Sequence, residues 1–120
     1  MKKILVVDDS ITSRAIFKAL IPQGRYEVIE ASDVTTALSQ ATEQNPDLCV
    51  MDYNLPEMNG TEIAEEIISA GISVPFILMT ANMQEGVVNR AKKIGFVGFI
   101  EKPISTTKIV DALRDLGWTS

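Results

Sequence analysis

Acidic, hydroxyl and amine side chains come directly after short apolar runs of this sequence. These residues are Asp8, Asp9, Asp52, Thr80 and Lys102. If the fold brings them together, two carboxylates about 4 Å apart repel by roughly 4 kcal/mol at an effective dielectric constant near 20. A divalent cation offsets this repulsion, and Mg²⁺ suits an all-oxygen ligand set that includes one or two carboxylates. Carboxylates around Mg²⁺, beside a hydroxyl and an ammonium group, are suited to phosphoryl transfer.

Asp52 is the predicted nucleophile, because it is the single acid after the central apolar run. It would become an aspartyl phosphate, while Asp8 and Asp9 hold the metal. Each residue also has a structural explanation when it is taken alone, such as a helix N-cap for Asp9 or a turn for Asp52. Those explanations require several independent coincidences at one place, which favours a site.

Five apolar segments predict the strands that position these residues. Three of them are continuous, which is typical of parallel strands buried on both faces: Ile4–Val7, Leu48–Met51 and Phe76–Met79. A fourth, Phe96–Ile100, is interrupted by Gly98. The weaker run Tyr26–Ala31 contains two glutamates and is predicted to form an edge strand.

Apolar residues with helical spacing lie between the predicted strands. Two sets follow i, i+3, i+4, i+7: Val34, Ala37, Leu38, Ala41 and Ile109, Ala112, Leu113, Leu116. Narrower stripes are Ala15, Ile16, Ala19, Leu20, then Ile63, Ala64, Ile67, Ile68, and then Val87, Ala91, Ile94. The predicted N-caps are Ser10, Asp33, Asn59 and Ser105, and the predicted C-terminal glycines are Gly24, Gly71, Gly95 and Gly117.

This alternation of strands and helices predicts an α/β fold, a three-layer α/β/α sandwich around an open parallel sheet. Open sheets of this kind bind ligands beyond the carboxyl ends of their strands, which is where the polar residues fall. The length of 120 residues predicts one domain, spanning 1–120.

Composition excludes several classes of function. The chain has one cysteine and no histidine, so thiolate or imidazole zinc sites and histidine-dependent catalytic triads cannot form. A net charge of −5 argues against a nucleic-acid partner. No apolar run approaches the roughly 20 residues that a membrane helix needs. We therefore expect a cytoplasmic protein that neither inserts into a membrane nor binds nucleic acid.

An ordered set of motifs resembles the receiver domain of bacterial two-component response regulators, of the stand-alone chemotaxis type. The motifs are Ile4-Leu5-Val6-Val7-Asp8-Asp9-Ser10, Met51-Asp52-Tyr53-Asn54-Leu55-Pro56 with Met58-Asn59-Gly60, Thr80-Ala81, and Gly98-Phe99-Ile100-Glu101-Lys102-Pro103. The resemblance runs from Lys3 to about Leu116. It implies a five-stranded, doubly wound, flavodoxin-like sheet with strand order 2-1-3-4-5, the order that is also found in a chemotaxis regulator.

The resemblance also implies a role for each site residue. Asp52 would be phosphorylated from the phosphohistidine of a histidine kinase. Mg²⁺ would be held by Asp9, Asp52 and the carbonyl of Asn54, with Asp8 acting through water. Thr80, Lys102 and the backbone N–H of Ala81 would bind the phosphoryl oxygens. Thr80 and Phe99 would move on activation, and the Lys102–Pro103 peptide would be cis.

Two positions depart from the pattern of the family. Phe99 stands at the switch position where the chemotaxis protein carries tyrosine, so no phenolic hydroxyl group is available there. Asn82 stands where an acid is common, and we hypothesise that Asn54 and Asn82 together set the lifetime of the phosphorylated state.

The main hypothesis is a phosphorylation-controlled binding module rather than an enzyme, with intrinsic phosphotransfer and self-dephosphorylation. Its expected partners are a histidine kinase, a downstream protein bound through the last strand and last two helices, and a phosphatase; we expect a monomer. One alternative is a Mg²⁺-dependent phosphatase with an aspartyl-phosphate intermediate, although Asn54 stands where such enzymes of the haloacid dehalogenase type want a second aspartate. The others are an FMN carrier, whose phosphate Asp8 and Asp9 would repel, and an unphosphorylated scaffold of the same fold.

Overall fold

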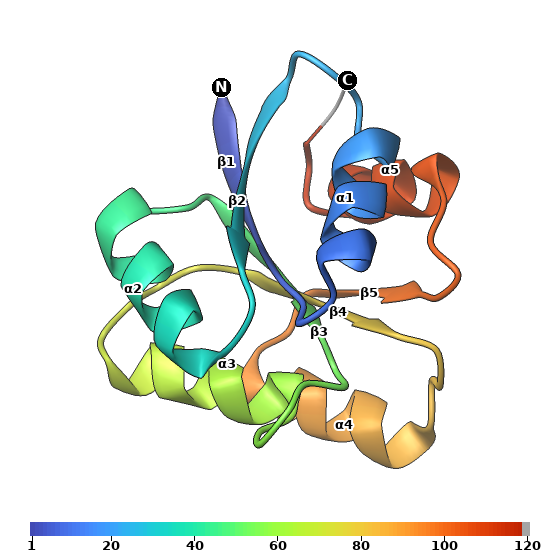
Figure 1. The fold of residues 1–120 in the computed structure, drawn as a ribbon. Helices are drawn as coiled ribbons and strands as arrows, with labels where there is room; N and C mark the ends of the chain where they lie inside the picture. Colours follow the sequence, from blue (N-terminus) through green and yellow to red (C-terminus); the bar gives the residue numbers. More distant parts are fainter. Residues whose placement is uncertain (119–120) are drawn as a thin grey trace.

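The computed structural model describes residues 1–118, in which five strands alternate with five helices (Figure 1). The strands are β1 (Lys2–Val7), β2 (Tyr26–Ala31), β3 (Leu48–Asp52), β4 (Phe76–Thr80) and β5 (Gly98–Glu101). The helices are α1 (Ile11–Leu20), α2 (Val34–Gln44), α3 (Gly60–Ser69), α4 (Glu85–Ile94) and α5 (Thr106–Asp115). None of these helices is long and apolar enough to cross a membrane.

The five strands form one parallel sheet in the order β2-β1-β3-β4-β5. This confirms the predicted order, with β2 at one edge. The register aligns the carboxyl ends of neighbouring strands: Val7 pairs with Met51, and Asp52 pairs with Met79. The residues that end or follow the strands are therefore brought to one edge of the sheet.

The sheet separates two apolar clusters, so that the molecule has three layers. Successive residues of β1 point to opposite faces: Ile4 and Val6 pack with α1 and α5, whereas Leu5 and Val7 pack with α2, α3 and α4. Figure 1 shows the same division, with α1 and α5 on one face of the sheet and α2, α3 and α4 on the other. Residues of β1, β3 and β4 are buried on both faces, which explains why their apolar runs are continuous.

Two of the predicted helical stripes were wrong in part. In α1 the residues that face the core are Phe17 and the following Ile21, whereas Ala15 and Ala19 are exposed and Ile16 is 46% exposed. In α3 the stripe ends at Ile67, because Ile68 is exposed.

The start of the last strand also differs from the prediction. Phe96 and Val97 precede β5 and are not part of it. Phe96 is nevertheless buried, with its ring 5.4 Å from that of Phe76 between the centroids. Its burial explains why it appeared to belong to the apolar run.

All four predicted N-caps accept a hydrogen bond from the backbone of their helices. Gly71, Gly95 and Gly117 follow the ends of α3, α4 and α5 with positive φ, as predicted. Gly24 was assigned wrongly, because it lies in the turn before β2 and does not terminate α1. The C-cap of α1 is Ile21. A non-glycine residue, Asn45, ends α2 in the left-handed conformation with φ of 47°.

Candidate functional site

The polar residues singled out from the sequence meet at the carboxyl edge of the sheet. Asp8 directly follows β1, Asp52 is the last residue of β3, and Thr80 is the last residue of β4. Lys102 directly follows β5, and its backbone N–H donates to the carbonyl of Thr80 at 2.9 Å. Four different strands thus supply the side chains of one site.

Three carboxylates gather at this edge. Asp8, Asp9 and Asp52 each offer an oxygen, and these atoms lie within 4.8 Å of one another. Asp8 is 1% exposed and Asp52 is 4% exposed, whereas Asp9 is open to solvent. Among the described residues, the buried side-chain polar atoms that lack a hydrogen-bond partner are Asp8 Oδ2 and Asp52 Oδ1.

These unpartnered oxygens fit a hard divalent cation. Buried carboxylate oxygens are costly unless they are paired or bind a metal, and an all-oxygen set suits Mg²⁺. Asp9, on the exposed side of the cluster, leaves room for the waters that Mg²⁺ retains. The residues present therefore match the metal that the sequence predicted.

Backbone contacts fix Asp8 in place. The backbone N–H of Ser10 donates to Asp8 Oδ1 at 2.9 Å, and the N–H of Asp8 donates to the carbonyl of Ala31 in β2 at 3.0 Å. Arg14 Nη1 donates to the Asp8 carbonyl oxygen at 2.6 Å. One carboxylate oxygen of Asp8 is thus used by the protein, and the other is left for a ligand.

Lys102 supplies the positive charge within the site. Its Nζ lies 2.9 Å from Asp52 Oδ1 and 3.8 Å from Asp8 Oδ2. The contact with Asp52 is an ion pair rather than a well-directed hydrogen bond, so Oδ1 keeps lone-pair capacity for another partner. Burial raises the pKa of Asp52 above its ordinary value, and the ammonium group of Lys102 opposes that rise.

The loop that carries Lys102 is braced from α5. The Lys102–Pro103 peptide is cis, as the resemblance implied. Lys108 Nζ donates to the carbonyl of Glu101 at 3.2 Å and to that of Pro103 at 2.9 Å.

A cavity of about 360 Å³, lined by Asp8, Lys102 and Ile16 among others, opens beside the site. Asp8 and Lys102 therefore border a cavity on the α1 side of the site.

The predicted switch residues lie on β4 and β5, where Thr80 ends β4 and Phe99 lies within β5. Thr80 is buried, and its Oγ1 donates to the carbonyl of Asn82 at 3.3 Å and accepts from the Asn82 backbone N–H at 3.2 Å. Its hydroxyl group is thus turned toward the loop after β4. Phe99 is half-buried and packs against the apolar cluster beneath α2, α3 and α4. Asn54 and Ala81 are exposed in the loops that follow β3 and β4.

Two supporting residues were not identified from the sequence. Gly60 begins α3, and a Cβ atom there would lie 2.7 Å from Met51 Cγ and still closer to the Asp52 carbonyl oxygen. A glycine after the Asn59 N-cap is a detectable signal for such a close approach. Arg14 carries no comparable signal, because its partners, Glu30 in β2 and the Asp8 carbonyl after β1, are brought to it by the fold.

Known proteins are similar to this chain in sequence and in fold. The sequence profile of the response regulator receiver domain matches residues 4–114. Chemotaxis protein CheY of Thermotoga maritima is 35% identical over 114 residues, covering 94% of this chain and 95% of that protein. The polar-differentiation response regulator DivK of Brucella anthropi is 30% identical over 115 residues, covering 94% of each. The structure of chemotaxis protein CheY4 of Vibrio cholerae superposes with a TM-score of 0.88 at 28% identity, covering 95% of this chain and 97% of that one.

Proposed function

Since this chain belongs to the response regulator receiver-domain family, whose members are modules of phosphorylation-dependent signalling, we propose that Asp52 accepts a phosphoryl group from the phosphohistidine of a histidine kinase. The observation that carries the proposal is the setting of Asp52. Its carboxylate is buried at the end of the central strand, with Lys102 Nζ at 2.9 Å and with oxygens of Asp8 and Asp9 within 4.8 Å.

The transfer forms one bond and breaks one bond. A carboxylate oxygen of Asp52 bonds to phosphorus while the P–N bond to the kinase imidazole breaks, and the imidazole nitrogen keeps the electron pair and takes up a proton. Lys102 and the backbone N–H of Ala81 bind the phosphoryl oxygens. Asp9, Asp52 and the Asn54 carbonyl would hold Mg²⁺, with Asp8 acting through water. Bound there, Mg²⁺ supplies positive charge that stabilises the oxygens of the transferred group.

Phosphorylation would change the conformation through Thr80 and Phe99. The Thr80 hydroxyl group exchanges its hydrogen bonds with the Asn82 backbone for one to a phosphoryl oxygen. Phe99, which is already half-buried, moves further inward. Because it has no hydroxyl group, its size and apolar surface are what would favour that movement. Asn54 and Asn82 flank the path of water to the acyl phosphate and set its lifetime. An unchanged rate of decay in both Asn54→Ala and Asn82→Glu would exclude this role for them.

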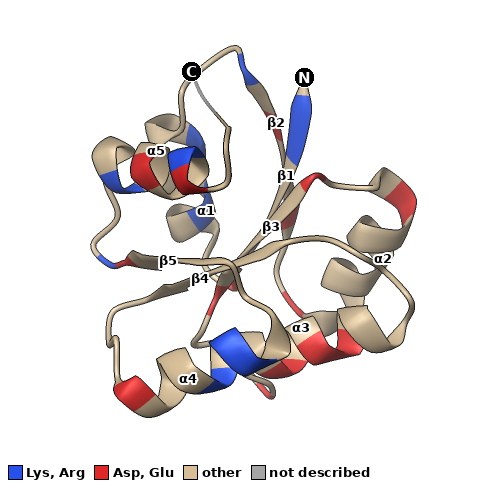
Figure 2. Cartoon of the chain, turned by 180° about the vertical axis from the view of Figure 1, so that it is seen from behind, with Lys and Arg blue, Asp and Glu red and all other residues tan. Residues whose placement is uncertain are grey.

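The output would pass to another protein through α4, β5 and α5. This surface carries Val97, which is 50% exposed, and the half-buried Val110. Figure 2 shows basic residues along the last turns of α4, where Lys92 and Lys93 are exposed.

We propose that residues 1–120 act as one monomeric domain in the cytoplasm, where the kinase can take its phosphoryl group from ATP. A role in chemotaxis is supported by relatives that are chemotaxis proteins.

Intact-mass measurement after incubation with acetyl phosphate tests the proposal. We expect a gain of one phosphate that requires Mg²⁺, is abolished by EDTA and is lost in Asp52→Asn. Asp111→Asn, an exposed aspartate on α5, is the matched control and should keep the gain.

Two other results would favour the alternatives. Absence of both the adduct and Mg²⁺ binding would contradict the proposal and favour an unphosphorylated scaffold. Catalytic turnover of free phosphate esters would favour the phosphatase instead.

A further inference from the structure

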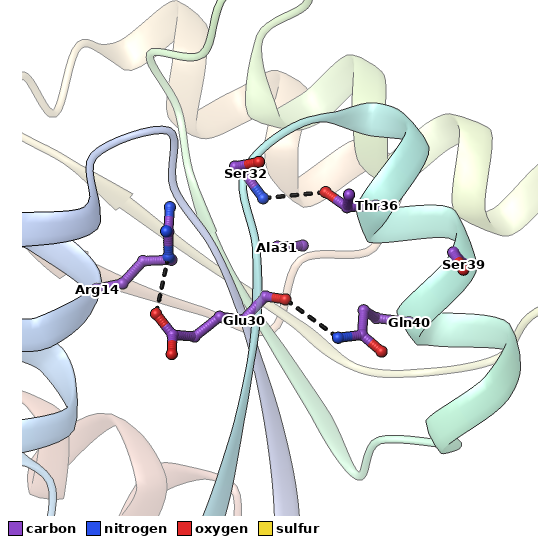
Figure 3. Close-up of a pocket in the computed structure, with 7 residues that line it drawn as sticks. All are labelled: Arg14, Glu30, Ala31, Ser32, Thr36, Ser39 and Gln40. Atoms are coloured by element: carbon purple, nitrogen blue, oxygen red, sulfur yellow. Dashed lines mark hydrogen bonds and ion pairs between the residues drawn. The ribbon is translucent and has the colours of Figure 1, made fainter.

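A cavity of about 310 Å³ lies between α1, β2 and α2, and most of the residues that line it have polar side chains (Figure 3). Arg14 enters it from α1 and Glu30 from β2, and the two side chains point toward each other. On the far wall, Gln40 Nε2 donates to the Glu30 carbonyl at 3.3 Å. The two side chains thus meet between α1 and β2, while the backbone of Glu30 is bound to α2.

Arg14 joins this cavity to the acidic loop, by which we mean Asp8 and Asp9 directly after β1. Its Nε donates to Glu30 Oε1 at 2.9 Å, and its Nη1 donates to the Asp8 carbonyl oxygen at 2.6 Å. Only 13% of the Arg14 side chain is exposed. The carbonyl that it holds belongs to the peptide between Asp8 and Asp9, so one guanidinium group connects the edge strand to the backbone of both acids.

The acidic loop needs such a contact because its carboxylates repel one another. Oxygens of Asp8, Asp9 and of Asp52 at the end of β3 lie within 4.8 Å of one another, and the Asp8–Asp9 peptide can relax outward unless its backbone is held. A guanidinium group has fixed donors in one plane and can hold two acceptors at once, which a single ammonium group on a flexible stem does less well. Glu30 fixes the orientation of that plane.

We propose that Arg14, oriented by Glu30, is a positioning residue that fixes the Asp8–Asp9 peptide and thereby sets the Mg²⁺ affinity of the site. This inference rests on the proposed function, since it assigns the strength of the same metal site. It extends the site beyond its ligands to a pair of residues on the far side of β1.

The sign of the effect separates positioning from charge. Removal of a positive charge beside a cation site, through electrostatics alone, strengthens the binding of Mg²⁺. Loss of positioning weakens it, because the carboxylates then relax apart. The two explanations for Arg14 therefore predict opposite changes in the dissociation constant.

Lys18 offers a matched control. It lies on the same helix, and its Nζ donates to the second oxygen of the same glutamate, Glu30 Oε2, at 3.2 Å. Its side chain is 49% exposed, and within residues 1–118 its ammonium group donates to Glu30 and not to the acidic loop. Lys18→Gln therefore removes the same charge without removing the contact with Asp8.

Titration calorimetry with MgCl₂ on the full chain tests the proposal. We expect the Mg²⁺ dissociation constant to rise by about tenfold in Arg14→Gln, the low end of the effect of residues that orient metal ligands. In Arg14→Lys the dissociation constant should rise by most of the factor found for Arg14→Gln, and in Glu30→Gln it should rise by less. Lys18→Gln should stay within about twofold, as befits an exposed ion pair. Saturating Mg²⁺ should restore phosphorylation of Arg14→Gln by acetyl phosphate.

Equal or tighter Mg²⁺ binding by Arg14→Gln would overturn the proposal, as would equal losses in Arg14→Gln and Lys18→Gln. If circular dichroism in EDTA shows that Arg14→Gln does not fold, then Arg14→Lys and Glu30→Gln decide, and unchanged affinity in both is evidence against positioning. If the wild-type chain shows no Mg²⁺ binding that is lost in Asp52→Asn, it is the proposed function that fails.

Discussion

Asp52 carries a negative charge whose burial the protein compensates only in part. Burial raises its pKa from the ordinary 3.8, the ion pair with Lys102 lowers it, and Asp8 and Asp9 raise it further. Between 3.8 and the raised pKa, the folded state keeps a proton that the unfolded chain releases. The free energy of unfolding therefore falls as the pH rises through that window, and the full cost is present above it.

Replacement of Asp52 should accordingly stabilise the metal-free protein. In EDTA at neutral pH we expect a higher Tm for Asp52→Asn than for the wild type, because a buried charge is removed while Lys102 keeps Asp8 at 3.8 Å. The difference should shrink as the pH falls through the raised pKa and disappear below about 3.8. Thermal melts across this range measure it, and a lower Tm for the variant at neutral pH would contradict the argument.

Gly60 lets the first turn of α3 lie against the end of β3, which carries Asp52. A Cβ atom there would overlap the carbonyl of Asp52 and the side chain of Met51, so Gly60→Ala should displace Asp52 and slow its phosphorylation. We also expect a loss of about 1–3 kcal/mol in the free energy of unfolding, as for other overpacked positions.

Gly86→Ala in α4 is the control, because nothing lies within 4 Å of a Cβ atom there. It should leave phosphorylation unchanged and raise stability by up to about 1 kcal/mol. Urea titrations and intact-mass time courses report both effects, and equal results for the two variants would refute the close-approach argument.

At the scale of single residues, the acids of the site could be predicted from the sequence, but the orientation of the Thr80 side chain beside them could not. Asp8, Asp9, Asp52 and Lys102 could be selected because each follows an apolar run, and the structure brings them together. The direction of the Thr80 hydroxyl group could not be predicted, because it depends on how the loop after β4 turns back toward it.

At the scale of the elements, local signals located the helix starts better than the helix faces. Ser10 and Asn59 were recognised as caps because a cap depends on a side chain and a backbone N–H three residues away. The face of α1 was predicted wrongly because alanine fits a buried or an exposed position, so the short stripe of apolar residues was ambiguous. Phe17 decides the buried face by its size.

The end of α5 is attached to the sheet by an aromatic contact. The ring of Trp118 stacks on that of Tyr26 at the start of β2, with 6.0 Å between centroids and 16° between planes. Lys2 Nζ lies over the same Trp118 ring, 4.6 Å from its centroid. This small cluster joins β1, β2 and the segment that follows α5.

Removal of the Trp118 ring should loosen that attachment. We expect Trp118→Ala to lose about 1–2 kcal/mol in the free energy of unfolding, from aromatic stacking and the cation–π contact together. Trp118→Phe should retain most of the stacking and serves as the matched control. Urea unfolding followed by circular dichroism measures both variants, and identical midpoints for Trp118→Ala and the wild type would show that the contact adds nothing to stability.

At the scale of the whole molecule, the class of the fold could be predicted but the order of its strands could not be derived. Continuous apolar runs show that β1, β3 and β4 are buried on both faces, and the weaker run marks β2 as an edge. Which strands are neighbours depends on where the chain reverses direction along the sheet. No local pattern encodes that reversal, so the order 2-1-3-4-5 came from the resemblance to a family.

The charge of the molecule is likewise understood only when its site is known. Three of the sixteen acidic residues form the cluster at the sheet edge, and the other thirteen nearly balance the eleven basic residues. The net charge of −5 thus reflects, in large part, one local centre rather than an acidic surface.

The contact between Lys2 and Trp118 also has a consequence for protein engineering. It places the first strand beside Trp118, the last residue that the structure describes. A short flexible linker could close the chain into a ring, and new ends could be opened in the exposed turn at residues 23–25. The order of the elements along the chain would change, while the carboxyl edge that holds Asp52 would stay intact.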